Sequence, residues 1–217
     1  PKYGDCQYPF KDLTGAGMAL KLAHGLIKTN FAKQDQDKYL DCFLDLASLG
    51  TIADLGFLVG ENRLIVKRGL KTLENTKWTG LRKIKELANI KEGDVIDTIK
   101  IGFHIAPRIN AAGRIGDPTL ALKLLLNEVE EVTEQTLSKE LEALNKERQN
   151  MTEAALTEVE EIFSDAKNFP YILIAHNKNW HVGILGLVAG KLAEKYGRPV
   201  IMMQDLGDTL TASARSP

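Results

Sequence analysis

A stretch of about thirty residues without glycine or proline constrains the fold of this chain more than any other feature. It runs from about Thr133 to Phe163, and its apolar residues follow in steps of 4, 3, 7, 4, 4 and 3, namely Leu137, Leu141, Leu144, Met151, Ala155, Val159 and Ile162. This spacing predicts one helix with one apolar stripe, about 45 Å long at 1.5 Å per residue. Such a helix is either a coiled-coil arm or a connector between two domains.

The chain before this stretch is mostly helical by its pattern. Apolar residues recur at helical spacing in three segments, which are 19–27, 40–47 and 64–73. Residues 96–103 are rich in β-branched side chains and predict a strand or an irregular segment. Asp117 and Pro118 are a good N-cap followed by proline at the first helical position, so they predict a helix that continues through Leu126.

The chain after the long helix has a different pattern. Residues 171–175 predict a buried strand, 182–195 a helix and 199–203 a second strand. Strand, helix and strand in this order form a βαβ unit with a parallel sheet. We therefore predict an α/β chain in three parts, with domain bounds at 1–127, 128–168 and 169–217.

Composition excludes several classes of protein. The 217 residues hold 28 Lys and Arg against 29 Asp and Glu, which is ordinary for a globular chain. Cys6 and Cys42 are too few for a zinc knuckle or a Cys-x-x-Cys pair, and we expect reduced thiols in the cytoplasm. No apolar run approaches the roughly 20 residues of a membrane span. The polar start without Met and the end at Pro217 predict a fragment of a longer protein.

Charge is distributed unevenly along the sequence. Between Arg63 and Lys85, eight basic residues stand against one acid, and between Glu128 and Asp165, twelve acids stand against three bases. The basic block contains Trp78, and a basic surface with an aromatic side chain suits single-stranded nucleic acid. A solvated helical face is the alternative for this block. The acidic block is interpreted as the exposed side of the long helix.

Two segments in the first half carry candidate chemistry. Asp54 follows an apolar helix and is flanked by small residues. It could ligate Mg²⁺ or Mn²⁺, since hard cations take oxygen ligands, or it could cap the helix. Arg108 and Arg114 bracket Asn110 and three small residues, which would let a charged ligand approach the backbone. Arginine can bind a phosphate bidentately, and a structural role toward carbonyl groups is the alternative.

The second half offers two more candidates. His181 lies where the first predicted strand of the βαβ unit meets its helix, a place where ligands and anions bind in α/β sheets. It is a better ligand candidate than the other three histidines. Ser213 and Arg215 alternate, so on a strand they would share one face. No P-loop, His-Glu-x-x-His or Gly-x-Ser-x-Gly motif supports nucleotide hydrolysis, a zincin or a serine hydrolase.

Together and in this order, these segments resemble the RecJ family of single-stranded-DNA-specific exonucleases in the DHH phosphoesterase superfamily. Residues 8–17 look like the segment that follows the family's Asp-His-His motif, and 49–54 look like its last metal-ligand motif. Residues 107–114 look like its Pro-Arg-x-Asn-Ala-Ala-Gly-Arg motif. The remaining likenesses are Leu144, Asn145 and Arg148 in the connector helix, residues 180–186, and the final Ser-x-Arg-Ser of the DHH-associated domain.

The resemblance implies a domain order and an activity. Residues 1–127 would be the C-terminal part of a DHH domain, 128–168 the connecting helix, and 169–217 the N-terminal part of a DHH-associated domain. The activity would be 5′-to-3′ hydrolysis of single-stranded DNA with two Mn²⁺ or Mg²⁺ ions, in DNA repair and recombination. Single-stranded DNA would be the partner, together with a single-strand-binding protein or a helicase.

The resemblance also assigns roles to single residues. Asp54 would be a metal ligand, and Arg114 would act with Asn110 and Arg108 on the scissile or a neighbouring phosphate. Asp54 and Arg114 would thus be the catalytic pair. Ser213 and Arg215 would bind the 5′-terminal phosphate across the cleft between the domains. His181 would lie in the cleft wall and complete the substrate-binding set.

The sequence departs from the family pattern in three places. The paired-Asp and Asp-His-His motifs are not in these 217 residues, which predicts that the chain alone is inactive. Ala212 and Ala214 replace glycines of the final motif, and alanine disfavours positive φ and crowds a phosphate. Leu55, Gly56 and Phe57 follow Asp54, where the family tends to have a proline.

Two other functions stay open on the sequence. One is a DHH-family phosphodiesterase that acts on oligonucleotides or cyclic dinucleotides, for which a shorter connector is expected. The other is a non-catalytic DHH-like replication scaffold, against which the retained Asp54, Arg114, Ser213 and Arg215 argue.

Overall fold

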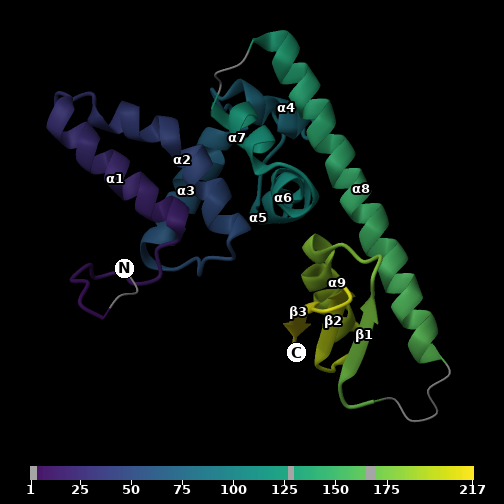
Figure 1. Ribbon diagram of the computed structural model, residues 1–217. Helices are drawn as coiled ribbons and strands as arrows, with labels where there is room; N and C mark the ends of the chain where they lie inside the picture. Colours follow the sequence, from purple (N-terminus) through teal and green to yellow (C-terminus); the bar gives the residue numbers. More distant parts are fainter. Residues whose placement is uncertain (1–3, 127–129, 165–169) are drawn as a thin grey trace. The chain divides into compact units, whose positions relative to one another are not determined.

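The computed structural model describes residues 4–126, 130–164 and 170–217 of the chain (Figure 1). The chain forms two compact units. Unit 1 consists of residues 1–107 and 123–138, and unit 2 of residues 108–122 and 139–217. The domain bounds expected from the sequence stay a prediction. None of the helices in the described ranges is both long and apolar enough to cross a membrane.

Unit 1 is built from helices. In chain order they are α1 (Gly15–Asn30), α2 (Gln36–Ala53), α3 (Gly60–Glu74), α4 (Thr79–Leu87), the short α5 (Thr98–Lys100) and the π-helical turn η1 (Ile101–Ile105). A core of buried apolar residues joins α1, α2 and α3 and includes Leu20, Leu44 and Ile65. The three helical segments expected from the spacing at 19–27, 40–47 and 64–73 are confirmed.

The predicted strand or irregular segment at 96–103 is wrong, because the chain is helical there. Asp97 begins the turn, and its side chain accepts a hydrogen bond of 2.7 Å from the backbone N–H of Lys100. Ile101 and Ile105 are buried four residues apart on one side of the helical segment, and Ile96 is buried just before the segment begins. Burial of these side chains therefore outweighs the preference of β-branched residues for strands.

Helices α6 (Ala106–Ile115), α7 (Pro118–Leu126) and α8 (Glu131–Ser164) follow. The predicted helix beginning at Pro118 is confirmed, and so is the long helix, which has 34 residues. Its buried side differs from the predicted stripe, because Ile162 is exposed whereas Asn145 and Thr152 are buried. The helix thus buries polar groups within an otherwise apolar side.

Unit 2 contains the predicted βαβ element. Strand β1 (Leu173–Asn177), helix α9 (Val182–Tyr196) and strand β2 (Val200–Asp205) are followed by β3 (Leu210–Arg215). The sheet order is β1-β2-β3, with β1 parallel to β2 and β3 antiparallel to β2. Helix α9 packs on this sheet (Figure 1). Its core is formed by buried residues of α8, α9, β1 and β2, among them Val159, Leu185 and Met202.

Candidate functional site

Asp54 lies just after the last residue of α2, where its backbone N–H donates a hydrogen bond of 3.0 Å to the carbonyl of Gly50. Its side chain is exposed. Among the described residues, no group of three or more His, Cys, Asp or Glu side chains could hold a metal ion. The described residues therefore do not by themselves form a metal site, and Asp54 is accessible to solvent.

The segment after Asp54 combines a fixed backbone with exposed apolar side chains. Leu55 has a φ of 53°, a conformation that non-glycine residues rarely adopt, and its side chain is 90% exposed. The backbone is held by two hydrogen bonds of 3.0 Å, from the N–H of Gly56 to Thr51 and from the Asn62 amide to the carbonyl of Phe57. Phe57 is 72% exposed.

Residues 108–114 lie on α6 and not in a loop. Ala111 and Ala112 are fully buried and serve helix packing, whereas Gly113 is exposed. The expectation that the small residues admit a ligand to the backbone stays a prediction, and only Gly113 could serve it. Arg108 makes a bidentate contact with Glu142 on α8, with distances of 2.6 Å from Nε and 3.1 Å from Nη2. This ion pair favours the structural alternative for Arg108. Asn110 is exposed on α6.

Arg114 lies at the end of α6 and contacts the first turn of α9. Its Nη1 donates a hydrogen bond of 3.3 Å to the carbonyl of Gly183. A Cβ at position 183 would lie 1.9 Å from the carbonyl oxygen of Arg114, so only glycine allows this approach. Asn110 lies one turn earlier on α6, at a spacing that places it on the same side as Arg114. Gly183 therefore fixes the position of Arg114 relative to α9.

His181 is the N-cap of α9. Its Nδ1 accepts a hydrogen bond of 3.0 Å from the backbone N–H of Gly183, which satisfies one of the unpaired donors of the first turn. The predicted ligand role of His181 is therefore restricted to Nε2, because Nδ1 already has a partner. A helix N-terminus carries a partial positive charge, and this one belongs to a helix of 15 residues.

Ser213 and Arg215 share one face of β3, as expected for alternate residues of a strand. Arg215 Nη1 donates to Ser213 Oγ at 3.3 Å and to the carbonyl of Ala214 at 2.7 Å. A Cβ at position 186 would lie 2.9 Å from Arg215 Nη2 and 3.0 Å from Ser213 Oγ, so both side chains lie against α9 at Gly186.

The two alanines of this motif do not disturb it. Ala212 and Ala214 lie within β3, and neither has a positive φ. Their side chains point to the face of the strand opposite Ser213 and Arg215, because successive side chains of a strand alternate. The backbone at these alanines therefore needs no positive φ, and the expected crowding of a phosphate stays a prediction.

Arg148 on α8 is a residue of this region for which the sequence reasoning proposed no role in binding. Its Nη2 donates a hydrogen bond of 2.9 Å to Asn145 Oδ1, whereas its Nε is buried without a partner. Burial, and then the neighbouring charge of Arg114, lower the pKa of Arg148 below its ordinary value. The signal in the sequence is the step of seven from Leu144 to Met151, where the stripe lacks an apolar residue.

Three residues of the basic block of unit 1, Arg68, Lys83 and Lys85, are bound to other groups of the protein. Arg68 pairs with Asp41 at 2.6 Å, and Lys83 with Glu86 at 3.2 Å. Trp78 is half-buried, and its Nε1 donates a hydrogen bond of 3.0 Å to the carbonyl of Cys42. This arrangement favours a structural face over a surface on which bases stack.

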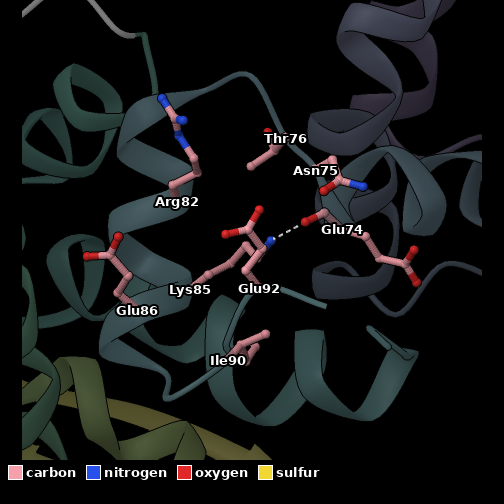
Figure 2. Close-up of a pocket in the computed structure, with 8 residues that line it drawn as sticks. All are labelled: Glu74, Asn75, Thr76, Arg82, Lys85, Glu86, Ile90 and Glu92. Carbon is pink, nitrogen blue, oxygen red and sulfur yellow. Dashed lines mark hydrogen bonds between the residues drawn. The ribbon is translucent and has the colours of Figure 1, made fainter. Parts of the chain in front are cut away.

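Lys85 of the same block lies at a cavity of about 300 Å³ (Figure 2). Its Nζ donates hydrogen bonds of 2.9 and 2.8 Å to the carbonyls of Leu73 and Glu74, at the C-terminus of α3. Burial lowers the pKa of Lys85. The cavity is lined by side chains of both charges, including Glu86 and Arg82, so Lys85 caps a helix and the cavity has no uniform charge for a ligand.

Comparison with known proteins places these observations in a family context. No family model matches the chain. It is 38% identical to the single-stranded-DNA-specific exonuclease RecJ of Bacillus subtilis over 205 residues, which is 94% of this chain and 24% of the relative. It is 33% identical to the RecJ of Escherichia coli over 232 residues, which is 100% of this chain and 39% of the relative. The chain thus spans between about a quarter and two-fifths of the length of these curated relatives.

Solved structures give the same result for the fold. The crystal structure of Thermus thermophilus RecJ in complex with Mg²⁺ matches with a TM-score of 0.81 at 32% identity, covering 99% of this chain and 32% of that one. The same protein in complex with Mn²⁺ matches with a TM-score of 0.79 at 32% identity, covering 94% of this chain and 29% of that one.

Proposed function

Because the chain belongs to the RecJ family, we propose that it is the part of a 5′-to-3′ single-stranded-DNA exonuclease that holds the 5′ end of the strand. One observation carries the proposal. Three polar side chains, from β3 and α6, meet the first turns of α9 at Gly183 and Gly186, namely Ser213, Arg215 and Arg114. Such an enzyme hydrolyses phosphodiester bonds in DNA repair and recombination.

The chemistry of these groups suits a terminal phosphate. A phosphate monoester is close to a dianion at neutral pH, and the guanidinium of Arg215 and the hydroxyl of Ser213 would donate to its oxygens. The N-terminal turn of α9 adds backbone dipoles of the favourable sign. Because Nδ1 of His181 accepts from Gly183, its Nε2 would be a further donor in this proposal. Arg114, with Asn110 on the same side of α6, would hold the next phosphate.

The metal part of the proposal is confined to one residue. Divalent ions such as Mn²⁺ or Mg²⁺ would supply Lewis-acid and water-activating chemistry. Since the described residues contain no ligand cluster, Asp54 would provide one ligand. We propose the cytoplasm as the place of action, and a single-strand-binding protein or a helicase as the source of the strand, on the family likeness alone.

The test compares 5′-phosphorylated and 5′-hydroxyl single-stranded DNA. Arg215→Ala should weaken binding of the phosphorylated strand by about 1.5–3 kcal/mol, the value of a hydrogen bond to a charged group, and should barely change binding of the hydroxyl strand. Lys191→Ala is the matched control, because Lys191 is exposed on α9 and carries the same charge. Equal losses on both strands for Arg215→Ala would refute the assignment of the 5′-phosphate site.

A salt titration separates this site from general attraction. Neutralising an exposed lysine of the basic block, such as Lys67, should weaken both strands alike and reduce the salt dependence of binding. Arg215→Ala should instead reduce the difference in affinity between the 5′-phosphorylated and the 5′-hydroxyl strand. If Lys67→Ala also discriminated between them, the discrimination could not be assigned to β3.

A further inference from the structure

Arg148 is held in place but not satisfied. One nitrogen, Nη2, donates to Oδ1 of Asn145, a side chain that is only 1% exposed. The Nε atom is buried and has no hydrogen-bond partner. A buried donor of a charged group without a partner is costly, and such groups call for an explanation. The hydrogen bond to Asn145 fixes the orientation of the guanidinium group.

The charge around Arg148 is also unbalanced. Arg114 of α6 is the neighbouring charge that acts on it, and both are cations. Glu142, six residues earlier on α8, is engaged by Arg108. The end of α6 packs against α8 here, since a Cβ at Gly116 would lie 2.9 Å from a side-chain carbon of Leu144. An anion bound by both guanidinium groups would relieve the repulsion between them.

We propose that Arg148 and Arg114 together bind an internal phosphodiester of the DNA strand, the one next to the 5′-terminal phosphate. This inference rests on the proposed function, since it takes the strand as the ligand. Arg114 contacts α9 at Gly183, and Arg215 contacts it at Gly186, three residues further along. The two contacts are therefore about 4.5 Å apart along the helix axis. Successive phosphates of one strand would meet successive turns of α9.

The inference predicts opposite effects on binding and on stability. Arg148→Gln removes a buried unsatisfied donor and a repulsive charge, while the glutamine amide can still donate to Asn145. The melting temperature of the free chain should therefore stay the same or rise, as at functional positions that cost stability. A merely structural arginine would give a lower melting temperature. Arg148→Lys keeps the charge but loses the planar guanidinium, so its affinity for the strand should lie between those of the wild type and Arg148→Gln.

The decisive experiment uses 5′-phosphorylated oligothymidylate with a single uncharged methylphosphonate at successive linkages, bound by the 217-residue chain. Arg148→Gln should bind the unmodified strand about 10- to 100-fold more weakly. At one linkage near the 5′ end, the methylphosphonate should weaken binding by the wild type to a similar degree and binding by Arg148→Gln no further. Lys146→Gln is the control, since Lys146 is exposed on α8 and loses the same charge.

The outcomes separate this inference from the function on which it rests. If Arg148→Gln behaves like Lys146→Gln, or if every methylphosphonate weakens both proteins equally, the two-arginine site is wrong even though Arg215→Ala still discriminates between 5′ ends. If the wild type does not bind the strand, or binds 5′-phosphorylated and 5′-hydroxyl strands equally, the proposed function is refuted and so is this inference.

Discussion

Three glycines of α9 allow the contact between α6 and α9 to be tested by single alanine substitutions. In a helix interior, alanine is more favourable than glycine by about 0.5–1 kcal/mol. Gly190 has no heavy atom within 4 Å of an added Cβ, so Gly190→Ala should raise the free energy of unfolding by about this amount. Gly190 therefore provides the reference for the other two positions.

Gly183 should respond in the opposite direction. An added Cβ would lie 1.9 Å from the carbonyl oxygen and 2.7 Å from the carbonyl carbon of Arg114, and both are backbone atoms that cannot rotate away. Helix α6 would have to move from α9. Overpacking of this kind costs about 1–3 kcal/mol, which exceeds the gain in helix propensity. Gly183→Ala should therefore lower the free energy of unfolding by about 1–2 kcal/mol.

Gly186 is an intermediate case with a different consequence. An added Cβ would lie 2.9 Å from Nη2 of Arg215 and 3.0 Å from Oγ of Ser213. These atoms are the ends of side chains that can change rotamer, so Gly186→Ala should leave the stability close to that of the wild type. The displaced guanidinium should nevertheless lose much of the preference for a 5′-phosphorylated strand.

The assay is urea unfolding followed by the fluorescence of Trp180, which is buried in unit 2, in a Trp78→Phe background that removes the signal of unit 1. The three variants are compared by their midpoints at equal slope. The order of stability should be Gly190→Ala, then the wild type, then Gly183→Ala. A Gly183→Ala variant as stable as Gly190→Ala would refute the close contact of α6 with α9.

Three further predictions concern unit 1 and the activity. Asp45 is 1% exposed and accepts a hydrogen bond from Thr76, and burial raises the pKa of its carboxyl group. The protonated carboxyl therefore stabilises the fold at acid pH, and this contribution is lost as the pH rises through the raised pKa. Asp45→Asn should therefore stabilise the chain at neutral pH and not at acid pH, as measured by thermal unfolding at both. If the proposed function holds, Asp54→Ala in an active protein carrying this sequence should lower turnover about a thousandfold or more while leaving DNA binding nearly unchanged. A near-normal rate would return Asp54 to the role of a helix cap. The 217-residue chain alone should release no mononucleotides from 5′-phosphorylated DNA in Mn²⁺, because the described residues contain no ligand cluster.

The periodic parts of the fold could be predicted from the sequence because burial repeats with the period of the element. The 34-residue helix α8 and the βαβ element both follow from spacing and from the position of glycine and proline. Residues 96–105 could not be assigned in this way. Their β-branched side chains favour a strand, whereas the buried pair Ile101 and Ile105 and the Asp97 cap favour a helix. Composition and periodicity conflict there, and only tertiary packing decides.

Some residues of the candidate site could likewise be predicted from the sequence, and others could not. Ser213 and Arg215 could be paired from the alternation of a strand alone, and the structure places them together. The ion pair of Arg108 with Glu142 could not be predicted, since 34 residues separate them and either role suits an arginine. Arg148 left a trace in the sequence as a gap in the apolar stripe. A charged residue at an otherwise apolar position of a helix is therefore a signal of function that pattern counting should retain.

Gly183 connects packing to binding in unit 2. Its N–H donates to His181, its carbonyl accepts from Arg114, and its lack of a side chain admits the backbone of α6. Because two of these contacts join Gly183 to Arg114, α6 cannot shift along α9 without breaking the hydrogen bond or the close approach. The position of the Arg114 backbone relative to α9 is thus set by packing at Gly183. A substitution at position 183 should consequently weaken contact with the internal phosphate while sparing the preference for a 5′-terminal phosphate.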